Sequence, residues 1–199
     1  MISFIDKLDK SILIWIHENH SPLFDSIMPF ITNKENWLLP IFILVILLGF
    51  KSGKKGKITL AILTLSIVFT DSICAQVFKP FFERLRPSHI SLDGLNLLVS
   101  KGGKYSMPSN HAANVFTISV IITYFFEYLK IPMFIFATII AFSRIYVGVH
   151  YPSDVVIGSL FGYLVGWTAL SLWVILKIRE LKRRKTWVWY ESDPPIFKN

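Results

Sequence analysis

The stretch SRIYVGVHYPSD, residues 143–154, lies where one apolar segment ends and the next begins. It places an arginine, a histidine and a carboxylate (Arg144, His150 and Asp154) side by side in the chain. Pro152 suits the first turn of a helix, because its missing N–H would have no partner there. A helix that starts at Pro152 brings Asp154 within one turn of His150, where the carboxylate can hold the imidazole. The stretch therefore predicts half of a phosphate-processing site at the mouth of an apolar helix.

Two other polar stretches change how this one is interpreted. Taken alone, an arginine or histidine beside a membrane span is more often an interfacial residue than a catalyst. The segment KPFFERLRP, residues 79–87, places Lys79 and Arg86 seven positions apart. The segment PSNH, residues 108–111, places His111 at a predicted helix start. Three such stretches in one chain favour a shared site.

In order and spacing the three stretches resemble the signature of the type 2 phosphatidic acid phosphatases, a family related to the vanadium haloperoxidases. The pattern is K-x6-RP, then PS-x-H, then SR-x5-H-x3-D, and the resemblance covers Lys79 to about Leu176. Asn110 stands where glycine is frequent, and asparagine tolerates a left-handed backbone better than most residues. The resemblance implies phosphate binding by Lys79, Arg86, Ser109, Asn110 and Arg144, and catalysis by His150, His111 and Asp154.

Composition indicates where such a site must lie. Hydrophobic residues make up 53% of the 199 residues and the mean hydropathy is +0.52, which exceeds the average of soluble proteins. A net charge of +8 and a pI near 9.6 are typical of nucleic-acid-binding proteins. Here, however, the basic residues cluster beside apolar runs, which fits membrane orientation better. We therefore expect the lipid bilayer, and no nucleic acid, as the partner.

The apolar runs predict an all-α, polytopic membrane bundle of about five to six transmembrane helices with an N-terminal interfacial helix. A single domain is expected, with an interfacial or re-entrant segment at residues 1–35, a transmembrane core at 36–176 and a basic cytoplasmic tail at 177–199. The expected spans are Asn36–Phe50, Ile58–Phe78, Tyr105–Phe126, Ile131–Ser143 and Val155–Leu176.

Charge bias predicts the orientation in the cell (inner) membrane. Residues 51–57 hold four lysines and residues 177–185 hold six basic residues, and such clusters favour the cytoplasmic side. Alternating the spans then puts all three motif stretches outside, on the periplasmic or extracytoplasmic face. Ser109 is expected to cap the third span, and the helix starts at Ser109 and Pro152 are expected to point their free N–H groups at one anion.

The residue types suggest a division of chemical roles. His150 is the better nucleophile because Asp154 can hold its other ring nitrogen, and His111 remains to protonate the leaving alkoxide. The family resemblance assigns the same roles. A two-metal phosphatase would need a cluster of carboxylates, which the outer segments lack, so neither a metal nor a cofactor is expected.

Other polar residues are predicted to have no part in catalysis. Asp71 is expected to form structural hydrogen bonds inside the bundle. Arg84 does not match a motif position. The remaining histidines, His17, His20 and His89, are interpreted as interfacial or loop residues.

The predicted function is a membrane lipid phosphatase that works through a phosphohistidine. Its substrate is expected to carry a phosphomonoester or pyrophosphate head group. The most favoured candidate is undecaprenyl pyrophosphate or another envelope lipid such as a lipid A phosphate. Phosphatidylglycerophosphate and phosphatidate come next, and a sugar phosphate last. A lipid phosphotransferase using the same site is the alternative enzyme. A transporter or structural bundle shares the hydropathy but has no reason to hold both histidines.

Overall fold

A computed structural model describes residues 2–191, and for residues 2 and 3 the backbone alone. The last eight residues of the predicted tail, 192–199, therefore lie outside the described part. All regular elements in residues 2–191 are helical, which confirms the all-α prediction. The α-helices are α1 (Ile2–Glu18), α2 (Pro22–Thr32), α3 (Leu38–Ile46), α4 (Gly53–Ile73), α5 (Lys79–Phe82), α6 (Asn110–Phe125), α7 (Lys130–Tyr146) and α8 (Pro152–Lys182).

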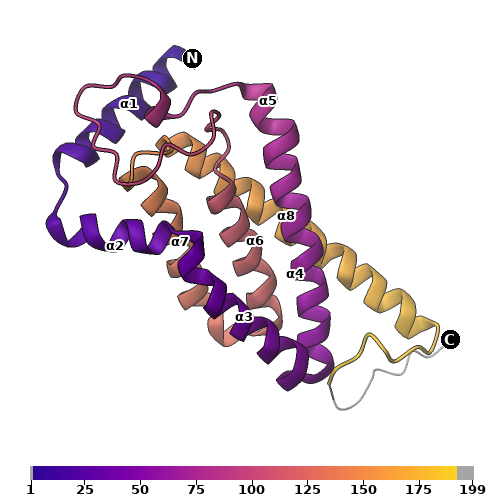
Figure 1. Cartoon of the computed structure of the whole chain (residues 1–199). Helices are drawn as coiled ribbons and strands as arrows, with labels where there is room; N and C mark the ends of the chain where they lie inside the picture. Colours follow the sequence, from indigo (N-terminus) through magenta and orange to yellow (C-terminus); the bar gives the residue numbers. More distant parts are fainter. Residues whose placement is uncertain (1, 192–199) are drawn as a thin grey trace.

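Helix α6 is the centre of the bundle, with α4, α7 and α8 packed around it (Figure 1). Buried hydroxyls tie it to two of these neighbours. The Thr117 hydroxyl donates to the carbonyl of Gly162 on α8 at 2.9 Å, and it lies 3.2 Å from the hydroxyl of Thr70 on α4. In an apolar bundle such bonds satisfy groups that would otherwise be costly to bury.

A stripe of glycines lets α8 approach α6 closely. A Cβ atom at Gly162 would lie 2.0 Å from the carbonyl oxygen of Ala113, and one at Gly158 would lie 2.5 Å from that of Ser109. Backbone atoms cannot move aside as a flexible side chain can. The small residues that the sequence spaces four apart are therefore required by helix packing.

Three helices are long and apolar enough to cross a membrane: Gly53–Phe82, Glu127–Tyr146 and Pro152–Lys182. A fourth is counted if the pair Pro22–Thr32 and Lys34–Lys51, bent by 63°, is one broken span. The predicted number of five to six therefore remains a prediction. The second expected span does not end at Phe78: the helix continues through Phe82, so Lys79 lies on a helix and not in a loop.

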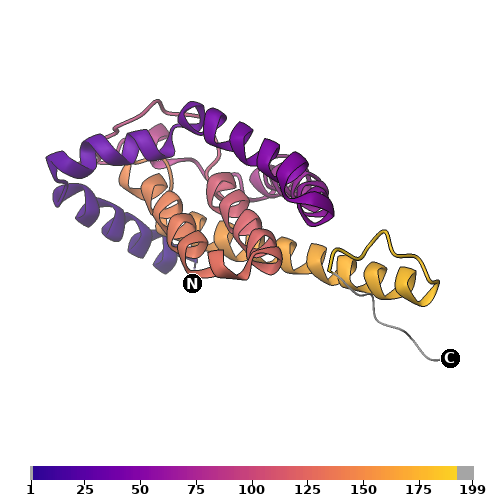
Figure 2. The ribbon, with the colours of Figure 1, turned by 90° about the horizontal axis from the view of Figure 1, so that it is seen from below.

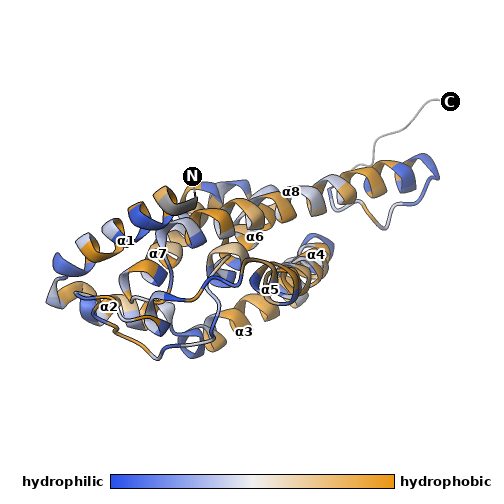
Figure 3. Cartoon of the chain, turned by 90° about the horizontal axis from the view of Figure 1, so that it is seen from above, coloured by the Kyte–Doolittle hydropathy of each residue, from blue (hydrophilic) through white to orange (hydrophobic). Residues whose placement is uncertain are grey.

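Helix α1 runs across one end of the bundle, separated from α2 by a break at Ser21 (Figures 1 and 2). Its ribbon carries polar and apolar residues on different sides (Figure 3). Phe4 and Trp15 are 68% and 64% exposed, whereas Asp9 and Leu13 are buried. An exposed apolar face of this kind suits a helix that lies at a membrane surface.

We expect Gly162→Ala to destabilise the bundle by about 1–3 kcal/mol, because the added methyl must displace the α6 backbone. Gly103→Ala is the matched control, since a Cβ there meets nothing within 4 Å. Melting temperatures in detergent would test the pair. Equal values for the two variants would contradict the close approach of α8 to α6.

Candidate active site

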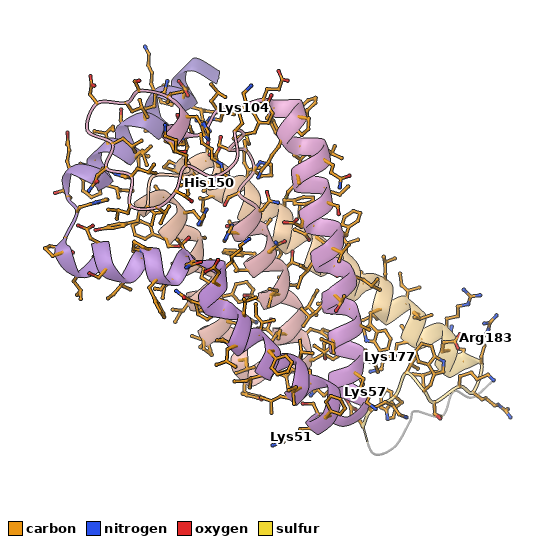
Figure 4. All side chains as sticks on the ribbon, in the orientation of Figure 1. Lys51, Lys57, Lys104, His150, Lys177 and Arg183 are labelled. Carbon is orange, nitrogen blue, oxygen red and sulfur yellow. The ribbon has the colours of Figure 1, made fainter. Side chains whose placement is uncertain are left out.

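The loop between α7 and α8 presents His150 at the end of the bundle that also carries Lys104 (Figure 4). The backbone N–H groups of Val149 and His150 both donate to the carbonyl of Arg144, at 3.3 and 3.2 Å. Gly148 makes the turn possible with a φ of +82°, where a side chain would be strained. His150 is 1% exposed, so this tight loop places a histidine in the protein interior.

Asp154 lies beneath this histidine in the first turn of α8, as predicted from Pro152. Its Oδ2 is 3.4 Å from Nδ1 of His150 and accepts a 2.9 Å hydrogen bond from the Tyr151 N–H. The two atoms lie within ion-pair distance, but the contact is not aligned as a hydrogen bond. Burial lowers the pKa of His150 to about 4, against the opposing effect of Asp154. The imidazole is therefore neutral at pH 7.

The cationic residues of the three motifs come together around the histidines. Arg144, in the last turn of α7, is 7% exposed and donates through Nη1 to the hydroxyl of Thr32 on α2. Arg86 is 8% exposed and donates through Nε to the carbonyl of Tyr105 at 3.1 Å. Electrostatic interactions reach His111, in the first turn of α6, from Arg144, His150, Arg86 and Lys79.

Ser109 and Asn110 differ in detail from the prediction. Ser109 precedes α6 but its side chain caps no N–H group, and its buried Oγ has no partner among the described residues. Asn110 is the first residue of α6, so it needs no left-handed backbone. Its amide donates to Asp71 at 2.8 Å, as that of Asn114 does at 3.3 Å. Asp71 thus forms the structural hydrogen bonds that were predicted.

Only one of the two expected helix N-termini remains open to an anion. At the start of α8, the Tyr151 N–H donates to Asp154 and the Ser153 N–H donates to Asp9 at 2.9 Å. Two carboxylates thus already occupy this N-terminus. The prediction that α8 offers free N–H groups is wrong, because Asp9 reaches it from α1. At α6 the first-turn N–H groups have no intrahelical acceptors and remain suited to phosphate oxygens.

Arg84 is the residue whose place the sequence did not reveal. Its Nη1 donates to Asp154 at 3.0 Å and to the Ser153 hydroxyl at 2.7 Å, and its Nη2 donates to Asp9 at 2.6 Å. The guanidinium also lies 4.0 Å from the centre of the Tyr151 ring. No sequence signal could have found these contacts, since Asp9 is far away in the chain and outside every motif.

Arg84 and Arg86 are held in opposite electrostatic conditions. Burial lowers the pKa of both arginines. At Arg84 the carboxylates of Asp154 and Asp9 outweigh burial, and the net pKa is raised. At Arg86 only the charge of Asp154 opposes burial, and the net pKa is lowered. Arg84 therefore has its anions within the protein, whereas Arg86 has a deficit of negative charge.

The remaining histidines are packed more firmly than predicted. His17 is 5% exposed, and its Nδ1 accepts the N–H of Asn96 at 3.1 Å. The ring of His20 stacks on that of Tyr146 at 4.1 Å. His20 lies in the loop between α1 and α2, as predicted, whereas His17 is on α1, and both rings contact the end of α7. Only His89 is exposed in a loop, with Nε2 3.2 Å from the carbonyl of Gly102.

In residues 2–191, no three or more His, Cys, Asp or Glu side chains lie where they could hold a metal ion. The expectation that the enzyme needs neither metal nor cofactor remains a prediction.

The family model of the PAP2 superfamily matches residues 59–178, which include all three motifs. The chain belongs to the PAP2 superfamily. Among its relatives is the lipid A 4'-phosphatase of Bacteroides thetaiotaomicron, 33% identical over 175 residues, which cover 84% of this chain and 77% of the relative. The undecaprenyl-diphosphatase of Sulfolobus acidocaldarius is 30% identical over 79% of this chain and 74% of its own length.

A solved structure of this superfamily has the same fold. The crystal structure of Aquifex aeolicus LpxE is similar with a TM-score of 0.67 and 28% sequence identity. The similarity covers 81% of this chain and 93% of that one. The resemblance suggested by the motifs is thus confirmed by sequence and by fold, and the PAP2 chain is a multi-helix membrane protein.

The low pKa of His150 predicts how stability depends on pH. Between pH 6.5 and about 4 the unfolded chain binds a proton at this histidine while the folded protein does not, so stability falls as the pH is lowered. We expect the melting temperature to drop more steeply over this range in the parent protein than in His150→Asn. Parallel curves for the two proteins would contradict a neutral, buried His150.

Proposed function

We propose that this lipid phosphatase transfers the phosphoryl group of its substrate to His150 and then to water. The observation that carries the proposal is the buried pair of His150 and Asp154, with three cations and a second histidine around it. A neutral, oriented imidazole is a nucleophile. With Nδ1 turned to Asp154, Nε2 is the nitrogen left to attack phosphorus.

In the first step the Nε2–P bond forms and the bond from phosphorus to the lipid oxygen breaks. His111, which takes up a proton when the phosphate dianion binds beside it, donates that proton to the departing alkoxide, and Asp154 stabilises the positive charge on the His150 ring. In the second step water attacks phosphorus, gives its proton to His111, and displaces Nε2. Phosphate leaves, and both histidines return to their starting states.

The cations supply the electrostatic part of catalysis. Buried charges are costly without a counter-charge, and in the described part of the chain neither Arg86 nor Arg144 forms an ion pair with a carboxylate. A bound phosphate would offset that cost, and its oxygens could accept hydrogen bonds from the planar guanidinium groups of both arginines. Lys79, Ser109 and Asn110 complete the proposed phosphate site, beside the open N-terminus of α6.

For the substrate we now place a lipid A-type phosphomonoester first and undecaprenyl diphosphate second. The Bacteroides lipid A 4'-phosphatase supports the first choice. The Sulfolobus undecaprenyl-diphosphatase supports the second. Both substrates belong to the class of envelope lipids that the sequence placed first and within which it did not choose.

The first test is phosphate release from a panel of lipid phosphates in detergent: lipid A bisphosphate, undecaprenyl diphosphate, phosphatidylglycerophosphate and phosphatidate. We expect the highest kcat/KM with lipid A, free phosphate in step with product, and loss of one phosphate by mass spectrometry. Phosphate that appears on a second lipid instead of in solution would identify a phosphotransferase. No dephosphorylation of any lipid would refute the proposed function.

The two histidines should differ in their effects on the reaction. His150→Ala is expected to abolish turnover and any acid-labile phosphoenzyme, because no other nucleophile is in line with phosphorus. His111→Ala removes the acid, a loss on the order of 10²–10⁴-fold with a lipid alkoxide, and an aryl phosphate should recover much of it. Quenched-flow trapping with labelled phosphate would measure both. A phosphoenzyme that survives His150→Ala but vanishes in His111→Ala would reverse the two roles.

We also propose that the active site faces the periplasmic or extracytoplasmic side. Lys51, Lys57, Lys177 and Arg183 gather at the end of the bundle opposite His150 (Figure 4). Such a basic end favours the cytoplasm.

Single cysteines can test this orientation in a Cys74→Ala background, because Asp93, Ser100 and Lys54 are all exposed. Cysteines at Asp93 and Ser100 should react with an impermeant reagent added outside intact cells. A cysteine at Lys54 should react only after lysis. The opposite pattern would place the site in the cytoplasm.

A further inference from the structure

Helix α1 reaches the active site through one carboxylate. Asp9 is 3% exposed, although α1 lies at the edge of the molecule. Its Oδ1 accepts the Ser153 N–H, and its Oδ2 accepts from the Ser153 hydroxyl and from Arg84. All these contacts join α1 to the first turn of α8 and to the loop before Arg86. Asp9 and Asp154 are thus linked through Arg84, which donates to both carboxylates.

Arg84 is the bridge between the two carboxylates. One guanidinium nitrogen bonds Asp154 and the other bonds Asp9, while its face lies over the ring of Tyr151. A planar guanidinium held at both nitrogens and on one face has little freedom to turn. The oxygen of Asp154 that Arg84 holds is Oδ1, and this leaves Oδ2 directed at His150 and the Tyr151 N–H.

We propose that Asp9 and Arg84 are positioning residues of the reaction. They fix the Asp154 carboxylate so that it orients the His150 ring and stabilises the imidazolium formed during the reaction. This inference rests on the proposed function of His150 and extends the catalytic machinery to α1, outside every motif. Asp9 anchors Arg84, Arg84 anchors Oδ1 of Asp154, and Oδ2 faces the imidazole. Neither residue belongs to the proposed phosphate site.

The balance of charge makes Asp9 necessary. If Arg84 were paired with Asp154 alone, its positive charge would offset most of the negative charge of that carboxylate. Asp154 would then stabilise the His150 imidazolium formed during the reaction less well. With Asp9 as a second carboxylate, the positive charge of Arg84 is shared. The carboxylate of Asp154 then keeps enough negative charge to stabilise the imidazolium.

The kinetic test compares Asp9→Asn with Asp6→Asn, the same change one turn earlier on α1. Asp6 is a suitable control because its side chain is 42% exposed, it pairs with Lys10 at 2.6 Å, and its own bond to Arg84 is long, at 3.5 Å, against 2.6 Å for Asp9. We expect Asp9→Asn to lower kcat about tenfold with KM unchanged, the effect that partners one contact away from a reacting centre have in metal sites. Asp6→Asn should retain kcat.

A double-mutant cycle separates positioning from folding. In an Asp154→Asn background, Asp9→Asn should cost little further kcat, because it acts only through that carboxylate. An equal tenfold loss in both backgrounds, a raised KM with kcat intact, or no loss at all would overturn the proposal. If Asp9→Asn does not fold, Arg84→Lys takes its place, since a lysine keeps the charge but cannot bond both carboxylates as a planar fork.

A readout that does not depend on activity distinguishes failure of this inference from failure of the proposed function. The charged and titratable groups that face His150 are Asp154 on α8, Arg86 in the loop, Arg144 on α7 and His111 on α6. NMR titration of the labelled His150 ring in detergent should show its pKa raised by Arg84→Gln, which frees Asp154, and lowered by Asp9→Asn. Shifts of the His150 pKa in the same direction in both variants, or no shift, would refute the positioning roles of Asp9 and Arg84 even if no substrate is found.

Discussion

The burial of arginine beside an apolar bundle is the constraint on which the rest of this structure depends. A guanidinium cannot lose its charge in a protein, so its burial must be offset by an anion. Arg84 meets this requirement with Asp9 of α1 and Asp154 of α8, and at the longer distance of 3.5 Å with Asp6. Among the described residues, Arg86 bonds a carbonyl and Arg144 a hydroxyl, and neither pairs with a carboxylate. The charge of Arg84 is therefore balanced within this part of the protein, whereas the unbalanced charge of the other two supports the phosphate site proposed above.

Close packing at the centre of the bundle holds these charges in one place. Because α8 approaches α6 at its glycines, the Ser109 N–H can donate to the carbonyl of Asp154 at 3.0 Å. One backbone bond thus joins the start of the helix that carries His111 to the start of the helix that carries Asp154. The separation of His111 and Asp154 is thus set by the backbone of both helices rather than by flexible side chains.

Much of this arrangement was predictable from sequence, because the decisive signals are local. The helix start at Pro152 and the reach of Asp154 to His150 both depend on residues within a few turns. The capping role of Ser109 and the open N-terminus of α8 were predicted wrongly, and the contacts of Arg84 were not predicted. The last two depend on a distant partner: Asp9 reaches Ser153 across 144 positions. Local patterns carry no information about which distant carboxylate fills a helix terminus.

Arg84 and Arg86 are two residues apart in the chain but differ in their surroundings. Leu85 pairs with Tyr105 in an isolated antiparallel bridge, so this short segment is extended. In an extended chain, alternate residues share a side, and both arginines turn inward while Leu85 is 38% exposed. The two arginines therefore differ in the partners that their side chains contact. Arg84 meets Asp9 and Asp154 and becomes part of the framework. Among the described residues Arg86 pairs with no carboxylate, and this unbalanced charge supports its place in the proposed phosphate site.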